Sequence, residues 1–334
     1  MKLTNAPRGA RQSVLVFGPP KTGKTQIVSL LAAKHKLIWF DLENGHATLF
    51  KLPPEAQENV ELISLADTRS YPIAIETCLK VIKGGKCAIC EAHGKIDCGI
   101  CKKSGAPFTN VELNALDSNS VVVFDSLTQL TNSAISHITK DKPDDYKLDF
   151  TDWGNLGKLM DVFLSHVQQA KFNVVCISHE TEVELEDGKV KLVPTAGTKN
   201  FSRNTAKYFG HCIYAQVSNL KHKFTSGTTS TMNIMVGSRT DVTLEKMNEP
   251  SLESIFAGGG NNILFKEQPS KQNEPINPTT NTETTDAQTS AGETKDESNS
   301  SAQTSSNATP GSIAASNLVG LAARLAAKRK EAAG

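Results

Sequence analysis

The fold is decided by residues 13–25, which read SVLVFGPPKTGKT. The first part, Ser13–Phe17, is a short apolar run rich in β-branched side chains, and it predicts a buried strand. The second part, Gly18–Thr25, satisfies the pattern G-x-x-x-x-G-K-[ST] and leads into apolar residues at helical spacing. A strand, a glycine-rich loop and a helix in this order predict a cradle in which backbone N–H groups hold phosphate.

The residues of this loop have distinct predicted tasks. Lys24 is expected to reach the β- and γ-phosphates of a nucleoside triphosphate, and Thr25 is expected to hold Mg²⁺. ATP with Mg²⁺ is therefore the predicted ligand. The predicted ATP-binding residues are Gly18, Pro19, Pro20, Lys21, Thr22, Gly23, Lys24, Thr25 and Gln26, together with Asp125.

Asp125 is the predicted partner of the loop in holding the metal. It closes the run Val121–Asp125, VVVFD, which is the most strand-like segment of the chain. Any buried strand can end in an aspartate at a turn. Behind a phosphate loop, however, a carboxylate at this place is typical of the Walker B residue that holds Mg²⁺.

The order of elements predicts an α/β fold. Strands alternate with helices through the first 180 residues, and this alternation favours a mostly parallel sheet with helices on both faces. Residues 182–193 predict a hairpin, and later strands are expected to extend the sheet in antiparallel fashion. Strands are expected at 13–17, 37–41, 60–65, 120–125, 173–178, 211–217 and 230–236, and helices at 25–35, 71–82, 127–138 and 153–171.

Four segments in this order, GPPKTGKT, FDLEN, VVVFDS and VVCISHE, resemble the RecA-like ATPase core. More narrowly, the chain resembles the phage RecA-like recombination ATPases of the Sak annealing group over about residues 12–258. The resemblance implies that Glu43 polarises the attacking water and that His179 senses the γ-phosphate, where RecA itself commonly has an amide. The alternatives are a solvated loop acid for Glu43 and a turn former for His179.

The resemblance also implies partners. Arg239, in the stretch Val236–Arg239, corresponds to the cation that a neighbouring protomer supplies in RecA-like rings and filaments, so a homo-oligomer is expected. Single-stranded DNA would bind two loops, 139–152 and 194–207. The second loop is the stronger candidate, because its bases surround one aromatic residue, as suits phosphate contacts and base stacking. Its candidate DNA-binding residues are Lys199, Phe201, Arg203 and Lys207.

Four of the seven cysteines lie within residues 87–101. They form the pairs Cys87-x-x-Cys90 and Cys98-x-x-Cys101, and two such pairs are expected to make a tetrahedral Cys₄ site for structural Zn²⁺. The site would lie in an insert at 84–106, and redox pairs or a cluster of free thiols are the alternatives. His93 lies between the pairs and is not expected to be a ligand.

The composition changes after the last aromatic residue, Phe265. The ATPase core is therefore predicted at 1–266. Residues 267–310 contain 7 acids and 2 bases in a polar context and predict a disordered linker. Residues 311–334 carry 4 bases, 1 acid and a leucine stripe, and they predict an amphipathic helix. This helix would dock on a neighbouring protomer, a single-strand-binding protein or DNA.

Charge and hydropathy exclude several classes of protein. The chain has 36 Lys+Arg and 35 Asp+Glu, which excludes a globally basic nucleic-acid binder. No apolar run approaches the length of a membrane span, and the first residues lack the apolar core of a secretory signal, so a cytoplasmic protein is expected. The predicted function is a DNA-stimulated ATPase acting on single-stranded DNA in phage recombination, repair or replication. A hexameric helicase or motor and a nucleotide switch without turnover remain the alternatives.

Overall fold

The computed structural model describes residues 11–68, 71–186, 188–227, 233–239, 243–247 and 249–256. The predicted linker at 267–310 and the predicted helix at 311–334 lie outside these residues. So does part of the strand predicted at 230–236. In the described part of this stretch, Ile234 makes a single parallel bridge to Leu192.

In the described residues the main sheet has eight strands, in the order β11-β10-β1-β7-β6-β2-β3 with β12 beside β10. The predicted α/β fold is confirmed, because β10, β1, β7, β6, β2 and β3 run parallel to one another. The bounds are β1 (Ser13–Phe17), β2 (Lys36–Asp41), β3 (Val60–Ser64), β6 (Ser120–Asp125), β7 (Asn173–Ser178), β10 (His211–Ser218), β11 (Lys221–Thr225) and β12 (Gly237–Ser238).

One prediction about the later strands is wrong. β10 was expected to be antiparallel, but it pairs parallel to β1, and only β11 and β12 run antiparallel to β10. The long connection from β7 to β10 explains the difference, since a crossover of a dozen or more residues lets a chain return to the same end of a sheet. A period-2 pattern alone carries no information on strand direction.

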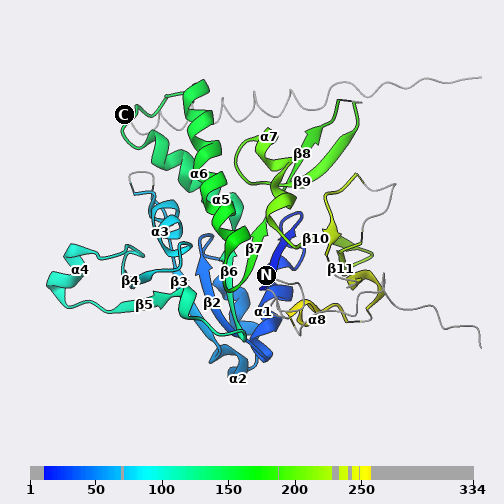
Figure 1. Ribbon diagram of the computed structural model, residues 1–334, viewed down its shortest axis with the longest axis horizontal. Helices are drawn as coiled ribbons and strands as arrows, with labels where there is room; N and C mark the ends of the chain where they lie inside the picture. The colour runs from blue at the N-terminus through cyan, green and yellow to red at the C-terminus, as the bar shows by residue number, and fades with distance from the viewer. Residues whose placement is uncertain are drawn as a thin grey trace, which may run out of the picture. The chain divides into compact units, whose positions relative to one another are not determined.

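Helices cover both faces of the sheet (Figure 1). Alternate residues of β1 show the two faces, because Leu15 and Phe17 belong to one core cluster while Val14 and Val16 belong to the other. The first face packs against α3 (Ile73–Val81), α5 (Leu127–Thr139) and α6 (Phe150–Gln169). The second packs against α1 (Lys24–Ser29), α2 (Pro54–Gln57), α8 (Glu253–Phe256) and the 3-10 turns Leu30–Ala33 and His46–Lys51.

Two small units are added to this core. The first is an antiparallel ribbon of β4 (Lys86–Cys90) and β5 (Phe108–Glu112), with the short helix α4 (Gly99–Ser104) between its strands. It projects beside α3 in Figure 1. The second is the hairpin of β8 (Glu180–Glu184) and β9 (Val190–Pro194), which forms a sheet of its own. After it come α7 (Lys199–Ser202) and a 3-10 turn, Thr205–Tyr208.

Among the described residues, no helix combines the length and the hydropathy needed to cross a bilayer.

Candidate nucleotide site and candidate metal centre

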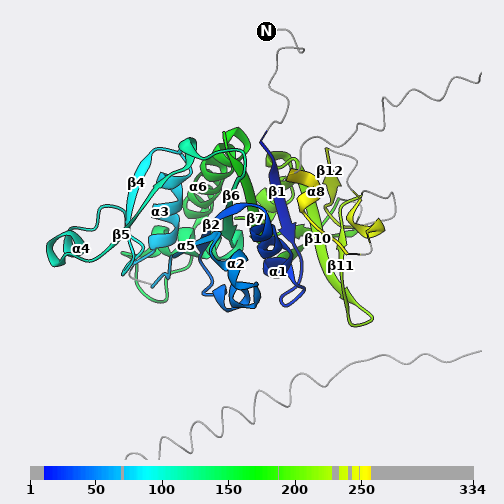
Figure 2. The ribbon, with the colours of Figure 1, turned by 90° about the horizontal axis from the view of Figure 1, so that it is seen from below.

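The phosphate loop connects β1 to α1 and is held tightly against β10 (Figure 2). Gly18 has φ 149°, and a Cβ placed on it would lie 2.1 Å from the carbonyl oxygen of Ala215. Only glycine fits this position, because the backbone of β10 occupies the space that any side chain would need. The loop is therefore fixed by the parallel pairing of β1 with β10.

Lys24 begins α1 with its amino group folded over the loop. Its Nζ donates to the carbonyl oxygens of Gly18, at 3.0 Å, and Pro19, at 2.7 Å. Burial lowers the pKa of Lys24, against the opposing effect of the nearby carboxylates of Asp125 and Glu43. A buried cation whose amino group donates to carbonyl oxygens gains from an incoming phosphate, which supplies full negative charge.

Thr25 and Asp125 are brought together as the sequence predicts. The Thr25 hydroxyl donates to Oδ2 of Asp125 at 3.0 Å, across the gap between α1 and the end of β6. Burial raises the pKa of Asp125 to about 7, and repulsion from Glu43 adds to this effect. A hydroxyl and a buried carboxylate side by side are oxygen ligands that suit a divalent cation such as Mg²⁺, so this pair would hold the metal.

Asp41 organises the turn that presents Glu43. It ends β2, is fully buried, and accepts backbone N–H groups of Glu43 at 3.1 Å, Gly45 at 3.0 Å and His46 at 3.2 Å. The imidazole of His46 also lies 2.8 Å from its second oxygen. These contacts leave the turn little freedom, so the direction of the Glu43 side chain is set by a neighbour two residues away.

The Glu43 carboxylate points toward the nucleotide side of the sheet. It accepts a hydrogen bond from the Ser126 hydroxyl and lies 3.5 Å from Nε2 of His179. Burial acts to raise the pKa of Glu43, but the hydrogen bonds from His179 and Ser126 outweigh it, so the pKa is lowered. Glu43 is therefore an ionised hydrogen-bond acceptor, as polarising a water molecule requires.

His179 follows β7 and stands between Glu43 and Lys24. Its Nδ1 lies 3.5 Å from Nζ of Lys24. Its backbone N–H donates to the Thr128 hydroxyl at 2.9 Å, and its carbonyl oxygen accepts the N–H of Thr195 at 2.8 Å. The predicted sensor thus contacts the phosphate-binding lysine on one side and the beginning of the 194–207 loop on the other.

These side chains line one cavity of about 400 Å³, which has the volume expected of a small-molecule site. Sequence reasoning missed several of its residues, among them Thr48, Lys51 and His222. The ring of His222, on β11, lies 3.0 Å from the carbonyl oxygen of Thr22. No local pattern could have indicated His222, because only the pairing of β10 with β1 brings this hairpin beside the loop.

Arg239 lies far along the sheet from this cavity. It follows β12, and its backbone N–H donates to Gly210 at 3.0 Å, next to the first residue of β10. The phosphate loop is at the opposite end, where Tyr214 of β10 pairs with Phe17. Arg239 therefore does not enter the site of its own chain, and its role in a neighbouring protomer stays a prediction.

The 194–207 loop is ordered by helical turns, and its three bases Lys199, Arg203 and Lys207 are exposed. Phe201 differs from these three bases. Its ring is partly buried, packs against the core and stacks on Tyr208 with centroids 6.0 Å apart. This contact covers one face of the Phe201 ring, and base stacking by Phe201 stays a prediction.

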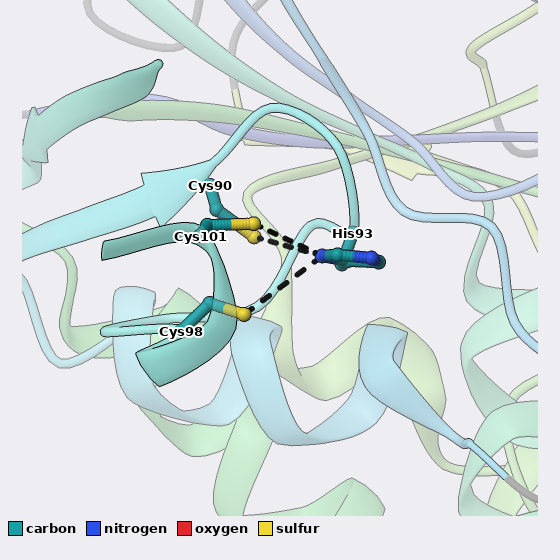
Figure 3. A group of neighbouring side chains, drawn as sticks. All are labelled: Cys90, His93, Cys98 and Cys101. Atoms are coloured by element: carbon teal, nitrogen blue, oxygen red, sulfur yellow. Dashed lines mark hydrogen bonds between the residues drawn. The ribbon is translucent and has the colours of Figure 1, made fainter. Parts of the chain in front are cut away.

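Four side chains of the ribbon insert converge on one point (Figure 3). Cys90, His93, Cys98 and Cys101 place their ligand atoms within 4.8 Å of one another. Nδ1 of His93 lies 3.1 Å from Sγ of Cys101 and 3.8 Å from each of the other two sulfurs. Backbone hydrogen bonding at the start of α4 lowers the pKa of Cys98 to about 6, which favours the thiolate. Three thiols and an imidazole are a typical ligand set for tetrahedral Zn²⁺.

Cys87 is not part of this group: where the sequence predicts Cys87 as a ligand, the structure brings His93 to the three other cysteines. Residues 86–90 form a strand, not a tight knuckle, and side chains three positions apart on a strand point to opposite faces. Cys87 packs into the main core, where burial raises the pKa of its thiol. His93 takes the fourth place in the group.

A family model described as an AAA domain matches residues 10–204. Among solved structures, one similar chain comes from a structural and biochemical study of a prototypical ATPase from the type III secretion system of pathogenic bacteria. It is 15% identical, with a TM-score of 0.35, and the match covers 63% of the present chain. The chain spans about half the length of that protein, since 52% of it is covered. No curated protein matches the chain.

The turn at Asp41 generates the first prediction. Asp41→Ala should lower ATP turnover by about 10²-fold while the affinity for ATP changes little, because Glu43 loses its orientation but the phosphate loop is untouched. Asp117→Ala is the control, since Asp117 also accepts hydrogen bonds at a turn, from the backbone N–H of Asn119 and the hydroxyl of Ser120. Steady-state turnover and fluorescent-nucleotide binding measure both effects, and equal turnover in Asp41→Ala and wild type would contradict the prediction.

The metal group generates the second prediction. Purified protein should carry one Zn²⁺ per chain, and Cys98→Ser and His93→Ala should each lower the zinc content, because each removes a ligand. Cys87→Ser should keep the metal, and so serves as the control with the same chemical change. Elemental analysis of protein purified without chelator decides between the two ligand sets: loss of zinc in Cys87→Ser with retention in His93→Ala would restore the Cys₄ set.

Proposed function

The chain belongs to the AAA domain family, and from this premise we propose that it is an ATPase whose turnover is coupled to single-stranded DNA. The observation that supports the ATPase chemistry best is the convergence of Lys24, Thr25, Asp125, Glu43 and His179 on one cavity. The DNA substrate, a RecA-like assembly close to the Sak group, and a role in phage recombination, repair or replication rest on the resemblance of the four sequence segments.

The residues divide the chemistry among them. Thr25 and Asp125 would hold Mg²⁺, which would neutralise the charge that develops on the phosphates. Lys24 would turn from the carbonyl oxygens of Gly18 and Pro19 to the phosphates. Glu43 would accept a hydrogen bond from the attacking water and align it with the γ-phosphate. Phosphoryl transfer needs little covalent help from a protein, so positioning by these groups carries most of the effect.

The contact between Glu43 and His179 suggests how nucleotide is sensed. Nε2 of the His179 imidazole lies 3.5 Å from the Glu43 carboxylate. A γ-phosphate carries more negative charge than a single carboxylate and would draw His179 toward it. Glu43 would then be free to contact the attacking water. The same movement of His179 would thus sense the bound nucleotide and make Glu43 available for hydrolysis.

Hydrogen bonds link His179 to the loop proposed to bind DNA. Thr195 donates its N–H to His179, and the Ser178 hydroxyl donates to the carbonyl oxygen of Thr195 at 2.8 Å. Further along, the N–H of Gly197 donates to the Thr131 hydroxyl at 2.9 Å. A displacement that reaches the backbone of His179 would therefore move the start of the segment that carries Lys199 and Arg203. We propose that this connection makes turnover depend on DNA.

Two substitutions separate binding from hydrolysis. Lys24→Ala should weaken ATP binding by roughly 10- to 100-fold, because it removes a charge-assisted contact to phosphate. Glu43→Gln should keep ATP binding and lower turnover by at least about 10²-fold, because the amide cannot act as the acceptor for the water proton. Turnover equal to wild type in Glu43→Gln would overturn the assignment, whereas a wild type that binds ATP without turnover would favour a nucleotide switch.

A double substitution tests the DNA loop. Replacing Lys199 and Arg203 with Ala should lower the affinity for oligo-dT. It should also reduce the slope of log Kd against log salt concentration by about 1.4, since each phosphate contact contributes about 0.7 to this slope. The control pair is Lys34 and Lys36, two exposed lysines near the amino end of β2. Basal turnover should survive in both double variants. Equal salt slopes would remove the loop from the proposal, and comparing single-stranded DNA, duplex DNA and RNA as stimulators defines the substrate.

A further inference from the structure

A second cavity, of about 760 Å³, lies between the ribbon insert and the segment that joins β3 to α3. The phosphate site does not use it. Its lining includes Tyr71 and Ile73 from the segment before α3 and at its start, and Lys95, Ile100 and Lys103 from the insert. The cavity is thus built from two parts of the chain that only the folded insert brings together.

Two large apolar side chains of this cavity are open to solvent. Tyr71 is 53% exposed and Ile100 is 71% exposed, one from each of the two parts of the chain that line the cavity. The backbone of Tyr71 is nevertheless fixed by two hydrogen bonds with Thr68, at 2.9 and 3.1 Å. An exposed aromatic ring and an exposed aliphatic side chain around one hollow offer apolar surface to a flat group, and such surface is typical of binding sites.

The charged residues of the cavity are lysines. Nζ of Lys95 lies 5.5 Å from the centre of the Tyr71 ring. The cavity lining within the described residues includes Lys103 and contains no aspartate or glutamate. The neighbouring acid, Asp97, forms an ion pair with Lys102, with Nζ 2.8 Å from Oδ1. It therefore does not neutralise the lysines that line the cavity. The occupant that complements this site has a flat face and negative charge.

We propose that this cavity binds a segment of single-stranded nucleic acid, with a base between Tyr71 and Ile100 and its phosphates at Lys95 and Lys103. Stacking on an aromatic ring together with phosphate contacts from lysines is the general means of holding single strands. Duplex bases are already stacked on one another and present no free face. The inference rests on the proposed function and adds to it a second contact outside the 194–207 loop.

The metal group forms part of the same wall. His93 and Cys98 line the cavity, and α4, which carries Ile100 and Lys103, is anchored by Cys98 at its start and Cys101 within it. A helix of six residues is not stable by itself in water. Zinc bound by the four ligands would therefore hold Ile100 and Lys103 opposite Tyr71, which makes the nucleic-acid contact depend on the metal.

The test uses full-length, zinc-loaded protein with Mg-ATP and fluorescein-labelled oligo-dT. Tyr71→Ala should weaken binding by about 10-fold, whereas Tyr71→Phe, which keeps the ring, should bind as wild type. Lys103→Ala should lower the salt slope by about 0.7. Lys102→Ala is the matched control on the same helix, because Lys102 is paired with Asp97, and its slope should not change. Zinc content and DNA-free turnover, which should stay at wild-type values, show that each variant is folded.

The outcomes separate this inference from the function on which it rests. Wild-type protein that fails to bind oligo-dT would overturn both. Wild-type binding that is lost in the Lys199 and Arg203 double variant but unchanged in Tyr71→Ala and Lys103→Ala would overturn this inference alone. A third measurement is the protection of Tyr71 from iodination when a ligand is bound. If a poly-glutamate peptide protects Tyr71 and oligo-dT does not, the cavity binds an acidic protein partner and the nucleic-acid assignment is overturned.

Discussion

Two buried carboxylates at neighbouring strand ends determine how the rest of the site is built. Asp41 and Asp125 are paired in register where β2 and β6 end. Asp41 is fully satisfied by three backbone N–H groups and His46, so it has a structural task and fixes the turn to Glu43. Asp125 accepts the Thr25 hydroxyl, but burial and repulsion from Glu43 outweigh this contact and raise its pKa to about 7. A divalent cation would suit this second carboxylate, so Asp41 has a structural role whereas Asp125 is a candidate metal ligand.

The parallel sheet is what allows such a division. Because β1, β7, β6 and β2 run in one direction, the phosphate loop, His179, Asp125 and the Glu43 turn all follow strands at the same edge. Each functional residue is therefore placed by a strand whose own position is fixed by two neighbours in the core. The β8–β9 hairpin and the ribbon insert are added to connections between strands, where they leave this edge undisturbed.

Sequence reasoning succeeded where chemistry and local pattern coincide. The phosphate loop, the strand ending at Asp125 and the acid after β2 are local features, and the structure brings them into one cavity. It failed where partners come from distant parts of the chain, as with His222 beside Thr22 and β10 beside β1. The spacing C-x-x-C misled for a physical reason. It gives two sulfurs on one side only in a tight turn, and the β4 strand separates Cys87 from Cys90.

The same strand explains why the insert matters to the core. Side chains alternate along β4, so Cys87 and Ile89 face the main core and Cys90 faces the metal group. β4 therefore contributes side chains both to the main core and to the metal group. Beyond it, Gly94 packs so closely on the end of β3 that a Cβ there would lie 3.0 Å from the Ser64 carbonyl oxygen. Ser64 is paired in register with Asp41, the residue that fixes the Glu43 turn. The metal group is thus only a few packed residues from the Glu43 turn, and such close packing would transmit a displacement of the insert to that turn rather than absorb it. An insert that binds nucleic acid would act on turnover by this short route, which is independent of the route through His179.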